Sequence, residues 1–237
     1  MHVLAIESST SRSSVAIVDH DRVVATAGLG VPRRHGEFIA PAIRFCLDQA
    51  GLTIDRLTGI AVGLGPGLFT GLRVGIATAQ SLAASLHLPS VGMSSLDVLA
   101  FQVRYAPGLT CAVIDARRGE LYWAMYRASP GGVQRLTELR LGKIDQLSAE
   151  LQSQGEDVLV VGDGALAYRK ELNDVDVDLA GPETAWPDAA VLGELAVPRF
   201  VREETQRPTE LQPIYLREAD AQLGWEQRGR LRGGEGA

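Results

Sequence analysis

The chain has 237 residues, of which 46% are hydrophobic, and it carries a formal net charge of −6 at pH 7. This length suits one large domain or two small ones with a real core, and the negative charge argues against a protein that binds nucleic acid without a basic partner. The first residues lack the charged and apolar regions of a signal peptide, no run is long enough to span a bilayer, and both cysteines lie in apolar runs, so we expect a cytoplasmic protein with no membrane contact.

The first half of the chain predicts the element order β-β-β-α-β-α. Short apolar runs at residues 3–6, 14–18 and 22–26, separated by turn residues, predict an antiparallel meander. Helical spacing follows from residue 35 to about residue 51, and Pro41 predicts either the start of this helix or a kink in it. A strand at residues 59–62, a glycine-rich loop, a helix to about residue 87 and a strand at residues 90–93 come next.

The second half repeats this order. Residues 111–114, 120–127 and 133–141 predict three strands, 144–151 a helix, 158–161 a buried strand, and a helical stretch opens at Gly162. Laying Glu7 on Asp115 aligns two β-β-β-α-β-α halves whose pattern repeats although their side chains do not. We then expect a loop at residues 173–187, a helix at 188–200 that Pro198 would end, an extended segment at 211–217 and disorder after Trp225.

A glycine-rich stretch at residues 63–75 joins the predicted strand at 59–62 to the helix after it. Gly65-Pro66-Gly67 predicts a tight bend, and Thr70 is placed to cap the helix. The helix carries Gly71, Gly75, Ala79 and Ala83 four residues apart, so one stripe has almost no side chain. Such a loop can bind an anion, but its spacing matches neither the P-loop nor the Gly-x-Gly-x-x-Gly motif, and close helix packing is the favoured interpretation.

Two β-β-β-α-β-α halves, each with a first strand that ends in a carboxylate, resemble the actin-like ATPase, sugar kinase and Hsp70 architecture, an α/β, ribonuclease H-like fold of two lobes. The match is closer at Ala5-Ile6-Glu7-Ser8-Ser9-Thr10, Arg34-His35-Gly36-Glu37, residues 65–73, residues 115–122 and Pro213-Ile214-Tyr215-Leu216-Arg217. These stretches resemble the TsaB (YeaZ-type) family. The resemblance implies a first lobe at residues 1–100 that carries partner-binding helices, a second, degenerate lobe at 101–217, and a disordered tail at 218–237.

The TsaB family is the dimerisation subunit of the bacterial machinery that makes N6-threonylcarbamoyladenosine in tRNA. The resemblance implies a non-catalytic scaffold that supports a TsaD-like catalytic subunit and works with a TsaE-like ATPase. A homodimer is implied when the catalytic subunit is absent, and tRNA is reached only through the complex. The alternative is an independent ATP-binding kinase or hydrolase of the actin-like fold.

The resemblance implies no catalytic residue and no metal site in this chain. The catalytic relative has two metal-binding histidines four residues apart, and Ser95 and Leu99 fall at those positions here. The candidate nucleotide-binding residues are Glu7, Ser9, Thr10 and Asp115, which would support weak ATP or ADP binding with magnesium, although no cofactor is required. Glu7 stands where the family has Asp. Asp115 could equally pair with Arg117 or Arg118, and Gly162-Asp163-Gly164 could equally be an ordinary turn.

The predicted partner surface consists of the two helices of the first lobe. The apolar face of the first helix is wider than one sheet contact needs, and the second helix carries the small-residue stripe. We expect an interface there rather than packing against the chain's own sheets alone, so that Gly75→Leu would abolish pairing and leave a folded monomer. The candidate interface residues are Phe38, Ile39, Ala42, Phe45, Leu72, Gly75, Ile76 and Ala79.

Overall fold

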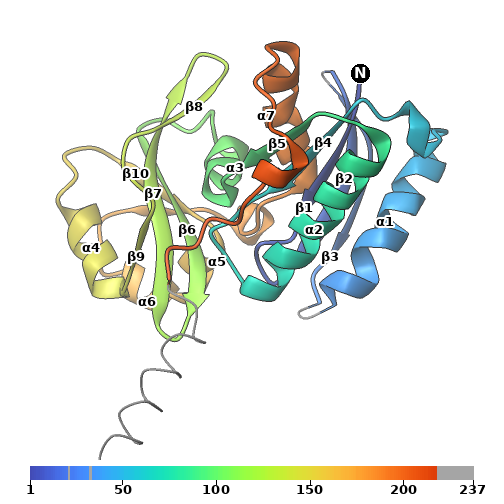
Figure 1. The fold of residues 1–237 in the computed structure, drawn as a ribbon. Helices are drawn as coiled ribbons and strands as arrows, with labels where there is room; N and C mark the ends of the chain where they lie inside the picture. The colour runs from blue at the N-terminus through green and yellow to red at the C-terminus, as the bar shows by residue number, and fades with distance from the viewer. Residues whose placement is uncertain (21, 32–33, 218–237) are drawn as a thin grey trace, which may run out of the picture.

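The computed structural model describes residues 1–20, 22–31 and 34–217, and the tail predicted at 218–237 lies outside them. Figure 1 shows two lobes side by side, each built on one sheet. The first sheet has the order β3-β2-β1-β4-β5. In it, β1, β2 and β3 pair antiparallel, which confirms the predicted meander, and β4 and β5 run parallel to β1. These strands are β1 (His2–Glu7), β2 (Ser13–Asp19), β3 (Arg22–Leu29), β4 (Gly59–Gly63) and β5 (Ser90–Met93).

The second sheet has the order β11-β10-β6-β7-β8, and β9 also pairs with β7. The single strand predicted at residues 133–141 is wrong, because the chain forms two short strands there. Between them the Thr137 hydroxyl accepts the Met125 backbone N–H at 3.0 Å, so a side chain takes the place of a backbone partner. The strands are β6 (Leu109–Arg117), β7 (Glu120–Ser129), β8 (Gly132–Arg135), β9 (Arg140–Gly142), β10 (Val158–Val161) and β11 (Asp178–Leu179), the last within the predicted loop.

Helices cover both faces of the first sheet. Alternate residues of a strand point to opposite faces, and in β1 Leu4 and Ile6 pack under α1 (His35–Ala50) and α2 (Phe69–Leu86). Val3 and Ala5 point the other way, towards α7 (Ala189–Val201). Figure 1 shows α1 and α2 side by side on the outer face of this lobe, with α7 on the side of the second lobe.

The second sheet is covered in the same way, but the helices are exchanged between lobes. One face packs on α4 (Ile144–Gln152), α5 (Asp163–Ala167) and α6 (Arg169–Leu172). The other face packs on α3 (Ser95–Gln102), which follows the first sheet in sequence. Helix α7 comes late in the chain yet packs on the first sheet, and it contacts α3, so these two helices pack together between the lobes. Short 3₁₀ helices occupy Ile54–Arg56, Pro182–Thr184 and Pro208–Glu210.

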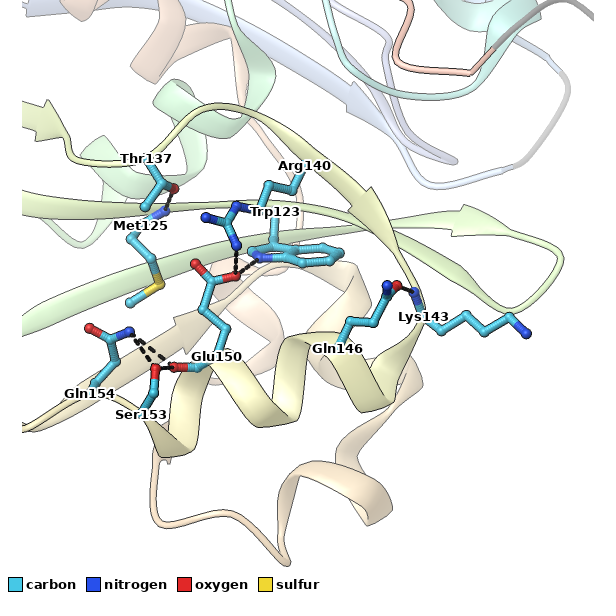
Figure 2. A network of polar contacts seen from close by, with 9 residues as sticks. All are labelled: Trp123, Met125, Thr137, Arg140, Lys143, Gln146, Glu150, Ser153 and Gln154. Carbon is cyan, nitrogen blue, oxygen red and sulfur yellow. Dashed lines mark hydrogen bonds and ion pairs between the residues drawn. The ribbon is translucent and has the colours of Figure 1, made fainter.

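A polar network fixes α4 against the outer face of the second sheet (Figure 2). The Trp123 indole N–H donates to Glu150 Oε2 at 2.7 Å, and Arg140 Nη1 lies 2.9 Å from the same oxygen. The backbone N–H of Lys143 donates to Gln146 Oε1 at 2.9 Å, where α4 begins. Glu150 therefore holds the last turns of α4 on the sheet, Gln146 caps the start of the helix, and Trp123 itself is almost fully buried.

Three details of the helices differ from the sequence-based expectations. Thr70 does not cap α2, because the helix already begins at Phe69. Pro198 lies inside α7 without ending it, and α1 begins at His35 rather than at Pro41, which lies inside the helix. Both prolines are exposed on the solvent side. Residues 95–102, for which no helix was predicted, form α3. No helix in residues 1–20, 22–31 and 34–217 has both the length and the hydropathy that a bilayer crossing requires.

Candidate functional site

The turn after β1 is where the glycine-rich loop and α2 meet the first sheet. A Cβ atom placed on Gly67 would lie 2.1 Å from the Ser9 carbonyl oxygen, and one on Gly71 would lie 2.1 Å from the Ser8 carbonyl oxygen. A Cβ on Gly75 would lie 2.3 Å from Ser8 Oγ. The Ser8 hydroxyl donates to the Gly71 carbonyl at 2.9 Å. These glycines let α2 lie directly on the turn, which supports the packing interpretation of the loop.

Glu7 ends β1 and is built into the junction of β1, β4 and α3. Its Oε1 accepts the Ser9 backbone N–H at 2.8 Å, and its Oε2 accepts the Ser95 hydroxyl at 3.0 Å. A Cβ on Gly63 would lie 2.0 Å from Oε2, so glycine there makes room for the carboxylate. Burial raises the pKa of Glu7, while the hydrogen bonds from Ser9 and Ser95 act to lower it.

The structure therefore brings Glu7 and Ser9 together, as predicted, but buries them. Glu7, Ser9 and Thr10 are 1%, 0% and 1% exposed. The nucleotide contact predicted for these residues stays a prediction about side chains that the fold encloses. Leu99, at the second of the metal-binding positions of the catalytic relative, is buried against the second sheet. In the part of the chain that the structure describes, no group of three or more His, Cys, Asp or Glu residues could hold a metal ion.

His35 begins α1 and connects three elements. Its Nδ1 lies 2.6 Å from the Ser13 hydroxyl on β2, and its Nε2 would lie 3.2 Å from a Cβ on Gly71 in α2. Burial lowers the pKa of His35, so the neutral imidazole is favoured. A neutral ring with one nitrogen hydrogen-bonded to a buried serine suits a residue that closes the start of a helix.

The second lobe holds its own carboxylates at the turn between β6 and β7. Arg117 Nη1 lies 2.8 Å from Asp115 Oδ2, which confirms the ion pair considered as the alternative to a nucleotide contact. The Asp115 backbone N–H donates to Asp163 Oδ1 at 3.0 Å. Burial raises the pKa of Asp163 to about 7. Asp163 was not predicted as a site residue, although its position after a buried strand and between two glycines was visible in the sequence.

The segment predicted as extended at residues 211–217 crosses from the first lobe to the second. The Ile214 N–H donates to the Leu64 carbonyl at 2.8 Å, and Arg73 Nε donates to the Tyr215 hydroxyl at 3.1 Å. Phe69 stacks on Tyr215 with ring centroids 5.8 Å apart. Arg217 then bonds to the β6–β7 turn through Glu120 and the Ala116 carbonyl. This segment, residues 211–217, therefore ties both lobes together beside the start of α2.

The structure corrects most of the predicted interface residues. Ile39, Ala42, Leu72, Gly75, Ile76 and Ala79 are buried inside the chain itself. The small-residue stripe faces the β1 turn and the first sheet, because a helix can approach a sheet this closely only through glycine and alanine. Of the predicted set, Phe45 is 51% exposed and Phe38 is half-buried. A Cβ on Gly75 would lie 2.3 Å from Ser8 Oγ, which argues against the expectation that Gly75→Leu leaves a folded monomer.

A second stripe of small residues on α2 points to solvent and was missed. Ala77, Ser81 and Ala84 are exposed, and they follow one another at intervals of four and three residues. Phe69, at the start of the same helix, is 47% exposed, and Phe45 lies on the neighbouring helix α1. We call these five residues the outer helix face. Their spacing could be seen in the sequence. When a helix has small residues on two faces, however, the sequence does not show which face packs against the chain's own sheet.

Known proteins resemble this chain over most of its length. A family model described as TsaD, tRNA N6-adenosine threonylcarbamoyltransferase, matches residues 6–225. The tRNA threonylcarbamoyladenosine biosynthesis protein TsaB of Escherichia coli is 32% identical, over 92% of this chain and 95% of its own, and that of Bacillus subtilis is 29% identical, over 95% and 98%. The structure of YeaZ from Pseudomonas aeruginosa matches with a TM-score of 0.78 and 29% identity, over 91% of this chain and 99% of its own.

A more distant structure supports the fold. The activator of 2-hydroxyisocaproyl-CoA dehydratase from Clostridium difficile matches with a TM-score of 0.53 at 9% identity, over 92% of this chain and 100% of its own. At that identity the likeness concerns the fold alone, and it agrees with the predicted two-lobed, actin-like and ribonuclease H-like architecture. The sequence relatives and the YeaZ match, over nearly their whole lengths, show more: this chain belongs to the TsaB family of tRNA threonylcarbamoyladenosine biosynthesis proteins, within the wider TsaD-type family.

Proposed function

We propose that this chain is a non-catalytic subunit that binds a TsaD-like catalytic subunit and holds it ready for threonylcarbamoyl transfer to the adenosine beside the anticodon of tRNA. The relatives' names support a place in threonylcarbamoyladenosine biosynthesis. The observation that carries the scaffold role is the outer helix face, where exposed small residues of α2 occur together with exposed Phe69 on the same helix and exposed Phe45 on the neighbouring helix α1. Small residues let a second helix approach closely, and the aromatic rings supply apolar area to bury.

The buried turn after β1 supports a subunit without its own chemistry. The space beside Gly67 and Gly71 is filled by the chain's own carbonyl groups, and the Glu7 carboxylate is engaged by Ser9 and Ser95. We therefore propose that no cofactor is required, and that any ATP or ADP with magnesium binds weakly. The net charge of −6 suits a subunit that reaches tRNA only through its partners in the cytoplasm.

The proposed assembly also contains a TsaE-like ATPase, and two copies of this chain pair through the outer helix face when the catalytic subunit is absent. One surface then serves two alternative partners, so the pair of identical chains would have to separate before the catalytic subunit binds. A surface of this kind is expected to be less apolar than an obligate dimer interface. Arg73, exposed on α2 beside Phe69, supplies that polar component.

A reconstituted reaction tests this function. The purified chain, its TsaD-like and TsaE-like partners from the same organism, threonylcarbamoyl-adenylate and unmodified tRNA are combined, and modified adenosine is measured by mass spectrometry. We expect product only when this chain and the catalytic subunit are both present, and no ATP turnover by this chain alone. Turnover of ATP by the isolated chain would instead support the rival kinase or hydrolase. Product made at full rate without this chain would rule out the scaffold role.

A further inference from the structure

A pocket of about 320 Å³ lies between the two lobes and takes no part in the function proposed above. Its walls come from three places that are distant in sequence: the β5–α3 region, the β7–β8 hairpin, and the second half of α7. In Figure 1 this hairpin and the end of α7 lie at one end of the molecule, and the start of α2 lies at the other. A ligand in this pocket would contact both lobes at once.

The pocket is far from the carboxylates of the second lobe. In the β6–β7 ladder, Tyr126 in the pocket wall pairs with Thr110 near the start of β6, whereas Asp115 pairs with Leu121 near its end. Five residues of strand separate Thr110 from Asp115, which is a distance of about 17 Å. The pocket is therefore a different place from the β6–β7 turn that holds Asp115.

Arginines dominate the polar lining of the pocket. Arg135 comes from β8 of the second lobe. Arg199 lies in α7, which packs on the first sheet, and Arg202 directly follows the end of that helix. Asp97 is the acidic residue among the lining residues, and it lies 3.5 Å from Arg135 Nη1. Because Glu204 pairs with Arg202, three guanidinium groups face two carboxylates, which leaves one positive charge in excess. Guanidinium groups match the oxygens of phosphate better than any other side chain.

The existing ion pairs of these arginines leave room for a ligand. Arg202 holds Glu204 at 2.7 Å, but both side chains are at least half exposed, and such surface pairs contribute little free energy. Asp97 is also held by the Tyr126 hydroxyl, which donates to its Oδ1 at 2.8 Å. Because Tyr126 keeps one carboxylate oxygen engaged, Arg135 can turn part of its guanidinium to an incoming anion without leaving Asp97 unpartnered.

Apolar side chains also line the pocket. They are Met93, Val133, Leu195 and Pro198, and the turn of the hairpin contributes Gly131, where an added Cβ would meet no atom within 4 Å. An inorganic phosphate would make no contact with these apolar side chains. A volume of about 320 Å³ is at the lower end of the range for small-molecule sites, which suits a ligand of mononucleotide size.

We propose that this pocket binds a small organic phosphate, with its phosphate held by Arg135, Arg199 and Arg202 and its organic part against Met93, Val133, Leu195 and Pro198. The ligand would join α7 to the β7–β8 hairpin and thereby fix the two lobes relative to each other. This inference is independent of partner binding, because none of these residues belongs to the outer helix face.

The test is calorimetric titration of the full chain with three probes: inorganic phosphate, ribose 5-phosphate and adenosine 5′-monophosphate, with adenosine as the uncharged comparison. We expect adenosine 5′-monophosphate to bind at least about tenfold more tightly than inorganic phosphate or adenosine, because its phosphate contacts the arginines and its nucleoside contacts the apolar side chains at the same time. Arg135→Gln and Arg199→Gln should each weaken this binding by about tenfold or more. Arg127→Gln, which changes an exposed arginine of β7 paired with Glu156 outside the pocket, should leave it unchanged.

Several results would overturn the proposal. One is no saturable binding of either organic phosphate at concentrations up to about 10 mM, which is far above the dissociation constant expected of a specific site. Another is equal weakening by Arg127→Gln, which would indicate attraction of anions to the whole surface. A third is binding that survives both pocket variants but is lost in Asp115→Asn, which would place the ligand at the β6–β7 turn. Circular dichroism of each variant separates these results from a failure to fold.

Discussion

Glu7 Oε2, at the end of β1, accepts a hydrogen bond of 3.0 Å from the hydroxyl of Ser95, the first residue of α3. The sequence placed Glu7 in a nucleotide cleft and Ser95 at a metal-binding position of the catalytic relative. In the fold the two side chains bond to each other, and with them the first sheet is joined to the helix that packs on the second sheet. This pair therefore belongs to the join between the lobes.

The Glu7–Ser95 bond predicts that Ser95→Ala destabilises the chain. Removing the hydroxyl leaves a buried carboxylate one donor short, which costs about 1 to 3 kcal/mol of the free energy of unfolding. Urea denaturation followed by circular dichroism measures this loss. Ser85→Ala is the matched control, because Ser85 is exposed near the end of α2 and should change stability by less than about 0.5 kcal/mol. Equal stabilities of the two variants would show that the bond contributes nothing.

A leucine should have opposite effects on the buried and on the exposed small-residue stripe of α2. Gly75→Leu should reduce the free energy of unfolding by about 1 to 3 kcal/mol, because its Cβ alone would lie 2.3 Å from Ser8 Oγ. Ala77→Leu, two residues along the helix and exposed, should fold normally and impair only partner binding. Thermal unfolding and analytical ultracentrifugation distinguish the two. A stable, folded Gly75→Leu chain would mean that the buried stripe has been assigned to the wrong face.

Asp163 predicts a dependence of stability on pH. Burial raises its pKa to about 7, above the value of about 3.9 in an unfolded chain, so the folded state holds this proton more tightly. The resulting stabilisation is complete below pH 4 and is lost as the pH rises towards 7. Asp163→Asn keeps an oxygen for the Asp115 N–H and removes the titration. The free energy of unfolding of Asp163→Asn, relative to that of the parent chain, should therefore increase by about 1 to 3 kcal/mol between pH 5 and pH 8.

The control for this experiment is Asp174→Asn, which changes an exposed acid after α6. Its stability relative to the parent chain should stay constant over the same pH range. Denaturation curves at five pH values for the three proteins are sufficient. If the free energy of unfolding changes with pH in the same way in Asp163→Asn and Asp174→Asn, Asp163 does not hold a proton in the folded state.

The segment at residues 211–217 predicts a local effect of Tyr215. Tyr215→Ala removes the stack on Phe69 and the hydrogen bond from Arg73, at a cost of about 1 to 2 kcal/mol. Tyr215→Phe keeps the stack and should lose less. Hydrogen exchange of the Ile214 amide, which bonds to the Leu64 carbonyl, reports on this segment. Unchanged exchange at Ile214 in Tyr215→Ala would mean that the segment is held elsewhere.

Much of the fold could be predicted from the sequence, because the spacing of apolar residues indicates its strands and helices and turn residues indicate where they end. The meander of β1 to β3 and the long helices α1 and α2 are confirmed. The predicted element order of the two halves is also confirmed, except that the third strand of the second half is divided into β8 and β9. The break between β8 and β9 could not be predicted, because it depends on a contact of Thr137 with a neighbouring strand. Helix α3 was missed because it is buried on several sides and carries little amphipathic pattern.

The site was harder to predict than the fold. Residue types showed that Glu7, Ser9 and the glycines belong together, but not that the turn fills the space which the glycines leave. For α2, spacing identified a small-residue stripe and assigned it to the wrong side, since Gly75 and Ala79 face the chain's own sheet while Ala77 and Ser81 face solvent. Which stripe is covered depends on packing between segments distant in sequence.

The affinity of this chain for its TsaD-like catalytic subunit, measured by calorimetry, tests the scaffold proposal most directly. Ala77→Arg places a charged side chain at the middle of the outer helix face and should weaken binding by about a hundredfold. Tyr105 is 85% exposed and lies beside Arg104, which pairs with Glu194 of α7 on the opposite face of the first sheet from α1 and α2, so Tyr105→Arg should bind like the parent chain. Binding that is tight in the parent chain and unaffected by Ala77→Arg would contradict the account.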